Sequence, residues 1–172
     1  MPLTTHLAQK KSAILGRWLS TIYESYPPET AIFLRKEKNR FDNPVGQRIA
    51  EGLEGLYGAL VQDMENEQVL NYLDQIIRIR AIQNFTPARA LAFIFLLKNV
   101  IREELADEIQ EENLAAEVLD LESRIDGLAL MGFDVYSKCR ERIYEVKANE
   151  MKGRVSFIMR KAGITEESLW QE

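Results

Sequence analysis

The chain has 172 residues, of which 46% are hydrophobic and 28% are charged, and its formal net charge is −5. This length can bury one ordinary hydrophobic core and is short for two, so we predict a single domain over residues 1–163 and a short tail over 164–172. The negative charge argues against nucleic acid as the main partner, because domains that bind nucleic acid present a broad basic surface.

The cysteine content and the lack of a predicted signal peptide or membrane span favour a cytoplasmic location. The single cysteine, Cys139, cannot form an internal disulfide, and no zinc-type spacing surrounds it. Lys10 and Lys11 precede apolar residues that Arg17 interrupts, so neither a signal peptide nor a membrane span is expected there. The apolar run 90–100 is too short to cross a bilayer. We therefore expect a cytoplasmic protein without membrane contact.

The first predicted helix ends before Pro27 and Pro28, which interrupt helical hydrogen bonding. Its apolar residues recur at helical intervals: Leu7, Ile14, Leu15, Trp18, Leu19 and Ile22. Residues 29–42 predict a short helix or turn followed by a loop. The next helix begins at Asn43, which can cap it, and Pro44, which fits the first helical position.

Two further apolar helices are predicted on either side of a sharply marked turn at residues 84–87. The first covers residues 65–83. The second follows Thr86, a good N-cap, and Pro87, which fits the first helical position. Because the run 90–101 is apolar at helical spacing, the segment predicts a buried helical hairpin.

A long helix is predicted from residue 112 to about residue 161, where the chain has no proline. Its apolar residues step by four and three, which approximates a heptad. Such a helix greatly exceeds the mean length of about 11 or 12 residues, so part of it should face something other than this domain's own core. A second copy of the chain is the simplest partner, although Gly127, Gly132 and Gly153 leave room for a break.

The hairpin carries the pattern R-I-R-A-[IV]-Q-x-F-[ST]-P-x-x-A-L-x-F-[IL]-F-x-L-K-x-x-[IV]-R-E-E-L over residues 78–105. Trp18, the N-P-V-G segment at 43–46, L-E-x-R-I-D at 121–126 and F-D-V-Y-x-K-C-R-E at 133–141 accompany it. Together, over roughly residues 10–152, they resemble the RsbRD-type N-terminal domain family.

That family is named for a stressosome protein, a co-antagonist of the RsbT kinase, whose amino-terminal half is a sensory module. The resemblance implies a regulatory sensor domain related to the non-haem globin-like domains of stressosomes. In such proteins a carboxy-terminal STAS domain normally receives the signal. Because this chain stops soon after the long helix, we expect it to act as a stand-alone sensor.

No constellation of catalytic or cofactor-binding residues stands out. His6 is the only histidine and lies in the expected frayed terminus, so we expect neither haem nor a metal site. Paired carboxylates such as Glu103 and Glu104 should lie on solvated helix faces, and no phosphate loop, serine elbow or kinase signature is present. Cys139 could ligate haem or sense oxidants, but its apolar stripe favours a small core residue. We predict no enzyme activity and no cofactor.

Arg78 and Arg80 stand among isoleucines, so at least one arginine should approach the apolar side, where an unpaired charge is costly. We expect a carboxylate partner on the long helix, and Asp126 and Asp134 are the candidates. Such a pair would lock the hairpin to the long helix. A polar pocket for a small anion at the same residues is the rival interpretation.

The fold expected from these patterns is an all-α, globin-like or bundle-like domain with a long carboxy-terminal helix. As a sensor it would work by dimerisation or by binding a regulatory protein, whose identity is unknown, through that helix. The residues expected to carry the interface are Leu128, Val135, Ile143 and Val146, and Trp170 could extend it.

The alternative function is a small-ligand carrier or minor enzyme with an apolar, basic-lined pocket. Arg78, Arg80 and Lys98 would then meet the acidic head of the ligand. A cavity lined by Phe93, Phe95 and Tyr57 would favour this alternative, and a filled core would favour the interaction module.

Overall fold

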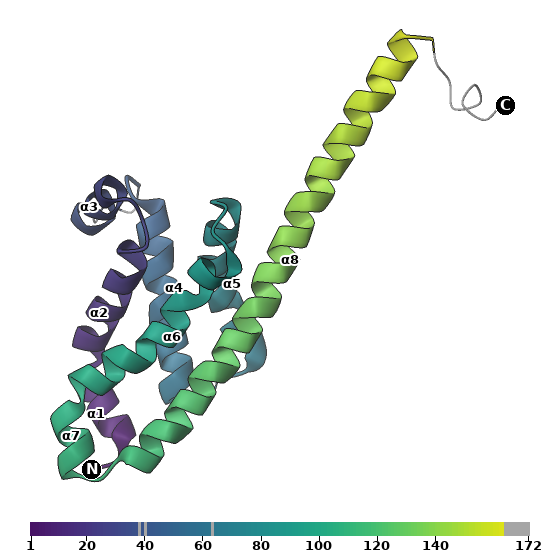
Figure 1. The fold of residues 1–172 in the computed structure, drawn as a ribbon. Helices are drawn as coiled ribbons and strands as arrows, with labels where there is room; N and C mark the ends of the chain where they lie inside the picture. The colour runs from purple at the N-terminus through teal and green to yellow at the C-terminus, as the bar shows by residue number, and fades with distance from the viewer. Residues whose placement is uncertain (38, 40, 63, 164–172) are drawn as a thin grey trace.

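The computed structural model describes residues 1–37, 39, 41–62 and 64–163. Within these residues the chain forms eight helices and no strand (Figure 1), which confirms the predicted all-α class. The helices are α1 (Leu3–Gln9), α2 (Lys11–Tyr23), α3 (Pro28–Lys36), α4 (Pro44–Val61), α5 (Asn66–Ile82), α6 (Pro87–Glu104), α7 (Ala106–Glu111) and α8 (Ala115–Lys161). The predicted tail and Trp170 lie outside the described residues.

Two helices begin where the sequence predicts, and for the predicted reason. The Asn43 side chain accepts a hydrogen bond from the Gly46 backbone N–H at 2.8 Å, and Pro44 occupies the first position of α4. Thr86 caps α6 by accepting from the Arg89 N–H, and Pro87 follows it. Both caps satisfy backbone donors that a helix end leaves unpaired.

The first predicted helix is divided into α1 and α2 at Lys10. The break allows α1 to lie against the end of α6 and the start of α8: the Leu3 N–H donates to Glu117 Oε2 at 2.7 Å, and Lys10 Nζ donates to the Glu104 carbonyl at 2.6 Å. The terminus is therefore held by tertiary contacts, and the prediction that it frays is wrong for its first helix.

The hairpin of α5 and α6 lies at the centre of the body and packs against α4, α2 and the first part of α8. Most of its apolar side chains are buried, as the sequence predicts, whereas Leu70, Ile82, Phe95 and Leu96 are exposed. Trp18 of α2 donates its indole N–H to the Phe93 carbonyl at 2.7 Å, and the two rings lie 6.1 Å apart. α8 crosses the hairpin at Gly132, close to Ile77, Leu91 and Ile94.

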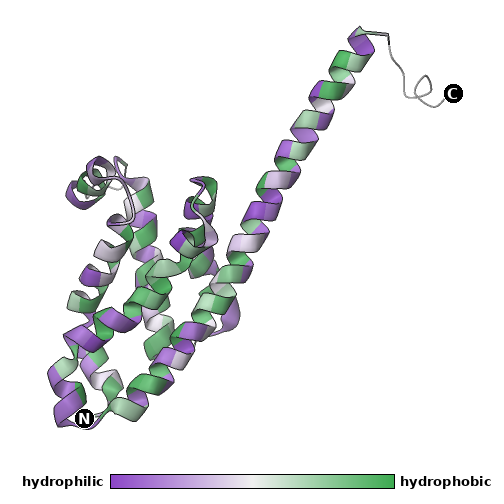
Figure 2. Cartoon of the chain, in the orientation of Figure 1, coloured by the Kyte–Doolittle hydropathy of each residue, from purple (hydrophilic) through white to green (hydrophobic). Residues whose placement is uncertain are grey.

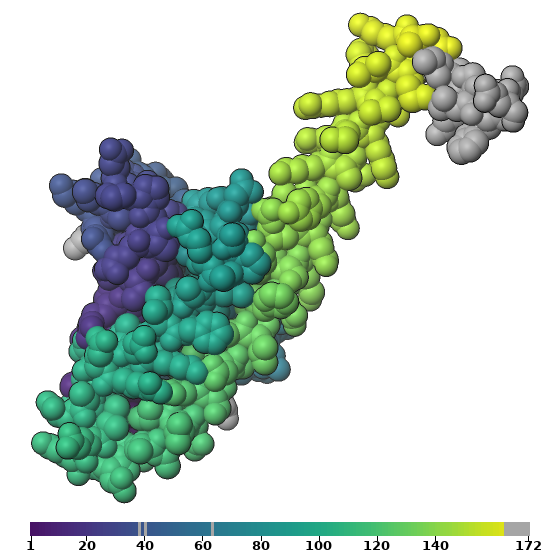
Figure 3. All heavy atoms as spheres, viewed as in Figure 1, coloured from purple at the N-terminus to yellow at the C-terminus, as the bar shows by residue number. Residues whose placement is uncertain are grey.

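α8 is one uninterrupted helix of 47 residues, about 70 Å long at 1.5 Å per residue. Its last buried residue is Tyr136, and beyond it the helix runs away from the body (Figures 1 and 3). Hydrophobic residues nevertheless continue into the free part among hydrophilic ones (Figure 2). No helix in the described part of the chain has both the length and the apolar character needed to cross a membrane.

Candidate functional site

The free end of α8 exposes apolar side chains that a folded domain normally covers. We call residues 144–161 the projecting segment. Five of its residues step by four and three on one face, and we call them the apolar stripe: Tyr144, Ala148, Met151, Val155 and Ile158. Met151 is 68% exposed and Ile158 63% exposed. Arg140 lies against the Tyr144 ring, 4.9 Å from its centre, and nothing else in the described part of the chain covers this face.

Charge is distributed unevenly between the two ends of the molecule. The projecting segment contains five basic and two acidic residues, whereas residues 103–122 contain nine acidic residues and no basic one. Several of these carboxylates are partly neutralised by the amino-terminal helices: Arg17 pairs with Glu103 and Glu104, and Lys10 pairs with Glu108 at 2.5 Å. The projecting segment therefore has a net positive charge, whereas residues 103–122 have a net negative charge.

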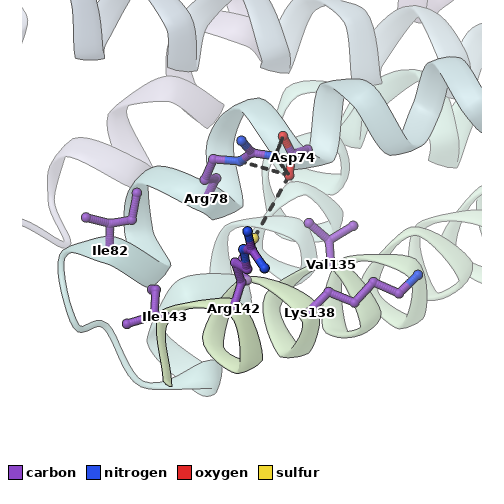
Figure 4. A pocket seen from close by; sticks show the side chains of 8 residues that line it. Asp74, Arg78, Ile82, Val135, Lys138, Arg142 and Ile143 are labelled. Atoms are coloured by element: carbon purple, nitrogen blue, oxygen red, sulfur yellow. Dashed lines mark hydrogen bonds and ion pairs between the residues drawn. The ribbon is translucent and has the colours of Figure 1, made fainter. Parts of the chain in front are cut away.

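A groove of about 550 Å³ lies between α5 and α8 where the long helix leaves the body (Figure 4). We call it the exit groove. Its lining residues are Asp74, Arg78, Ile82, Val135, Lys138, Cys139, Arg142 and Ile143. Arg78 pairs with Asp74 at 2.8 Å along α5, and the Cys139 thiol lies 3.9 Å from Asp74 Oδ1. Burial, and secondly the negative charge of Asp74, raises the pKa of Cys139, so the groove holds a protonated thiol.

The predicted ion-pair lock between α5 and α8 is wrong in its residues. Arg78 pairs with Asp74, four residues earlier in the same helix, and Asp126 pairs with Lys98 at 2.5 Å. Asp134 is exposed. The ion pairs that join the hairpin to α8 in the described part of the chain come from α6 instead: that Lys98 pair and a two-bond pair described next.

Arg102 of α6 donates to both carboxylate oxygens of Glu122 on α8, at 2.6 and 2.7 Å. Glu122 is almost fully buried, whereas the Arg102 side chain is half exposed. A two-bond arginine–carboxylate pair fixes both distance and orientation. Together with the Lys98–Asp126 pair, it fixes the position of α8 along α6.

Arg80 is buried, as the sequence predicts for one of the two arginines, but its partners are not carboxylates. It is 1% exposed. Its Nε donates to the Ala90 carbonyl at 3.1 Å, and Nη2 donates to the Arg89 carbonyl at 2.7 Å and to Ser25 Oγ at 3.0 Å. The guanidinium carbon lies 4.3 Å from the centre of the Phe85 ring. Nη1 has no hydrogen-bond partner among the described residues.

The residues predicted for the dimer interface fall into two groups. Leu128 and Val135 are only 7% and 8% exposed and pack in the chain's own core, so they cannot carry an interface in this conformation. Ile143 is half-buried at the exit groove, and Val146 is exposed. Most of the heptad predicted from the sequence therefore packs into the chain's own core. The apolar stripe lies on a different face of the helix. The spacing of four and three residues that starts at residue 144 could have revealed it from the sequence.

The rings expected around a ligand cavity line neither the exit groove nor the groove beside the turn between α5 and α6. Phe93 and Tyr57 are buried, and the Tyr57 hydroxyl donates to the Leu7 carbonyl at 2.8 Å. Phe95 is half exposed. Lys98, expected to meet an acidic ligand head, pairs with Asp126.

His6 lies inside the fold rather than in a solvated terminus. It is 4% exposed, and its Nε2 is 3.2 Å from a Glu112 carboxylate oxygen. Among the residues described, no group of three or more histidine, cysteine or acidic side chains is arranged to hold a metal ion.

Comparison with known proteins identifies the domain. A search of curated proteins found no match, and a search of solved structures found none either. The family model of the RsbT co-antagonist protein RsbRD N-terminal domain matches residues 12–151, which include nearly all of α2, the whole of α3 to α7 and most of α8. The match covers most of the chain, and the chain belongs to the RsbRD N-terminal domain family.

Proposed function

We propose that this protein is a regulatory sensor module that signals by pairing its projecting segment with that of a second copy of the chain. The family supports the regulatory class, because it is defined by a domain of a signalling co-antagonist. The observation that carries the proposal is the apolar stripe, left uncovered on a helix that has left its own domain. We infer a non-catalytic role in the cytoplasm.

A second copy is the occupant that the spacing of the stripe favours. Apolar residues that alternate four and three apart form the seam of a coiled coil, and identical helices are complementary along such a seam. The stripe from Tyr144 to Ile158 covers about two heptads. So short a seam gives weak association, which suits a switch that a stimulus must be able to shift.

The body supplies the means of shifting that association. α8 is held on α6 by the ion pairs of Glu122 and Asp126 and packs on it as far as Gly132, and its contacts with α5 end at the exit groove. A change in how the hairpin packs would therefore alter the direction in which the projecting segment leaves the body. We propose that this reorientation is the signal that a regulatory partner reads.

The test is the molar mass in solution, measured by light scattering over about two decades of concentration. The variant M151E/V155E places two charges in the seam and is expected to shift the protein to monomer at every concentration. The control V146E/F157E adds the same charges to the same helix at exposed apolar residues outside the stripe, and is expected to dimerise as the wild type does.

Equal loss of dimer in both variants would show that the face around Val146 takes part, as the sequence first suggested. A wild type that stays monomeric throughout would overturn the self-pairing proposal. In that case an acidic protein partner for the basic projecting segment becomes the better candidate.

A further inference from the structure

A second groove, of about 380 Å³, lies beside the turn that joins α5 to α6. We call it the turn groove. It is formed by residues between 25 and 30 and between 83 and 89, and no acidic residue lines it. Arg89 supplies a cation, the rings of Tyr26 and Phe85 supply apolar surface, and Gln83 and Asn84 supply side-chain amides. This combination is typical of a site that binds a small polar molecule through a few directed contacts.

Arg80 lies directly behind the wall of the turn groove. Its guanidinium stacks on Phe85, lies 5.6 Å from the centre of the Tyr26 ring, and bonds to the Arg89 carbonyl and Ser25 Oγ, all of them groove residues. Arg89 stacks on the same Phe85 ring, 5.0 Å from its centre. Two guanidinium groups therefore share one aromatic ring.

This cluster has an uncompensated positive charge. None of the ion pairs within the described residues gives Arg80 or Arg89 a carboxylate, and Nη1 of Arg80 has no acceptor. Burial lowers the pKa of Arg80, and the charge of Arg89 adds to the effect, although the Tyr26 hydroxyl opposes it. A buried charge without a counter-charge is costly, and in a low-dielectric wall its field reaches further than it would in water.

We propose that the turn groove binds a small organic anion, a carboxylate or a phosphate ester, whose charge contacts Arg89 and whose apolar part lies on Tyr26 and Phe85. The anion supplies the counter-charge that Arg80 lacks. This site differs from the anion pocket expected at Arg78 and the α8 aspartates, since Arg78 has its own partner in Asp74.

The turn groove is connected to the base of the free helix by hydrogen bonds. The Tyr136 hydroxyl donates to the Phe85 carbonyl at 2.6 Å, and Arg140 Nη1 donates to Asn84 Oδ1 at 3.2 Å and to the Ala81 carbonyl at 3.1 Å. Asn84 has a φ of 60°, a strained backbone conformation for a residue other than glycine. A ligand that moves this turn therefore moves the point at which α8 leaves the body.

Binding is tested by thermal unfolding with sodium benzoate and, separately, inorganic phosphate, at constant ionic strength set with sodium chloride. For the probe that fits, the expected rise in Tm is about 7 °C at a hundredfold excess over Kd. The variant R89Q is expected to abolish the rise, and R154Q, which removes an equal charge from the projecting segment, is expected to keep it. Arg89 and Arg154 are both exposed, so neither change should prevent folding.

A rise with benzoate alone assigns a carboxylate ligand, and a rise with phosphate alone assigns a phosphate. No rise with either probe at about 50 mM, or an equal rise in R89Q, overturns the proposal. Binding does not require the dimer, so failure of this test and failure of the proposed function are distinguishable.

The connection to α8 does rest on the proposed function and has its own measurement. Saturation with the active probe is expected to change the dimer dissociation constant of the wild type by about threefold or more, which corresponds to a modest coupling. In the variant Y136F/R140Q binding should persist and the dimer should no longer respond. If the probe leaves the dimer dissociation constant of the wild type unchanged, the proposed coupling between the turn groove and α8 is overturned.

Discussion

Buried charges in this protein are held in two different ways. Glu122 meets Arg102 through two hydrogen bonds, whereas Arg80 is held by two backbone carbonyls, a serine hydroxyl and an aromatic ring. Arginine can use such partners because its planar guanidinium has five donors and stacks on rings. Burial of an arginine was therefore predictable from its apolar neighbours, but its requirement for a carboxylate was not.

The Arg102–Glu122 pair should contribute to stability because its acid is almost fully buried. The variant E122Q keeps the shape and removes the charge, and it is expected to lower the free energy of unfolding by about 1–2 kcal/mol. D120N changes an exposed acid two residues away and should have little effect. Urea unfolding curves of the two variants make the comparison, and equal midpoints would show that the pair adds nothing.

The Cys139 thiol should react slowly at neutral pH, because its pKa is raised and the thiolate is the nucleophile. When the rate of alkylation by iodoacetamide is measured against pH, we expect the half-maximal rate at a higher pH than for an ordinary thiol. D74N removes the nearby negative charge and frees Arg78, so both effects should lower the pKa and speed alkylation by about threefold or more at pH 7.5. D134N, which changes an exposed acid on α8, is the matched control. A D74N rate equal to wild type would show that burial alone sets the pKa.

At the scale of the element, α8 is a single helix that performs two tasks along its length. Its first part lies on the hairpin, and Gly132 allows the close approach there. Its last part leaves the body with an apolar stripe uncovered. None of its three glycines breaks it, because a glycine costs a helix only about 1 kcal/mol, which the packed body and the long continuous hydrogen-bond ladder can absorb.

Replacing the glycines of α8 by alanine should lower the stability of the protein at one position and raise it at the other two. A Cβ at Gly132 would lie 3.0 to 3.2 Å from Ile94, Ile77 and Leu91, so G132A is expected to destabilise by about 1 kcal/mol despite the better helix propensity. A Cβ at Gly127 or Gly153 meets nothing within 4 Å, so alanine there should stabilise by up to about 1 kcal/mol. Thermal unfolding of the three variants decides, and a stabilised G132A would mean that α8 is not tightly seated on the hairpin.

At the scale of the whole molecule, charge and shape are both asymmetric. The acidic stretch at residues 103–122 includes α7 and the start of α8. The projecting segment, whose net charge is positive, forms the other end of α8 (Figure 1). Lys147, Arg154 and Lys161 flank the apolar stripe on one side. Pairing two copies along the stripe therefore brings like charges together.

That repulsion predicts the sign of the salt dependence. If the stripe pairs with itself, raising sodium chloride from about 50 to 500 mM should screen the basic flanks and lower the dimer dissociation constant by about twofold or more. If the segment instead binds an acidic surface, salt should weaken the association. Sedimentation equilibrium at the two salt concentrations separates the cases, and a weaker dimer at high salt would contradict pairing along the stripe.

The sequence by itself determined the features that depend on neighbours within one or two helical turns. The caps at Asn43 and Thr86, the prolines that follow them, the hairpin and the length of the last helix all have such local causes, and the family pattern is read from the same residues. Only the tertiary structure decided which charges meet and which apolar residues stay uncovered. Asp126 pairs with Lys98, Leu128 enters the core and Met151 stays exposed, because those outcomes depend on which surface the folded chain brings opposite each side chain.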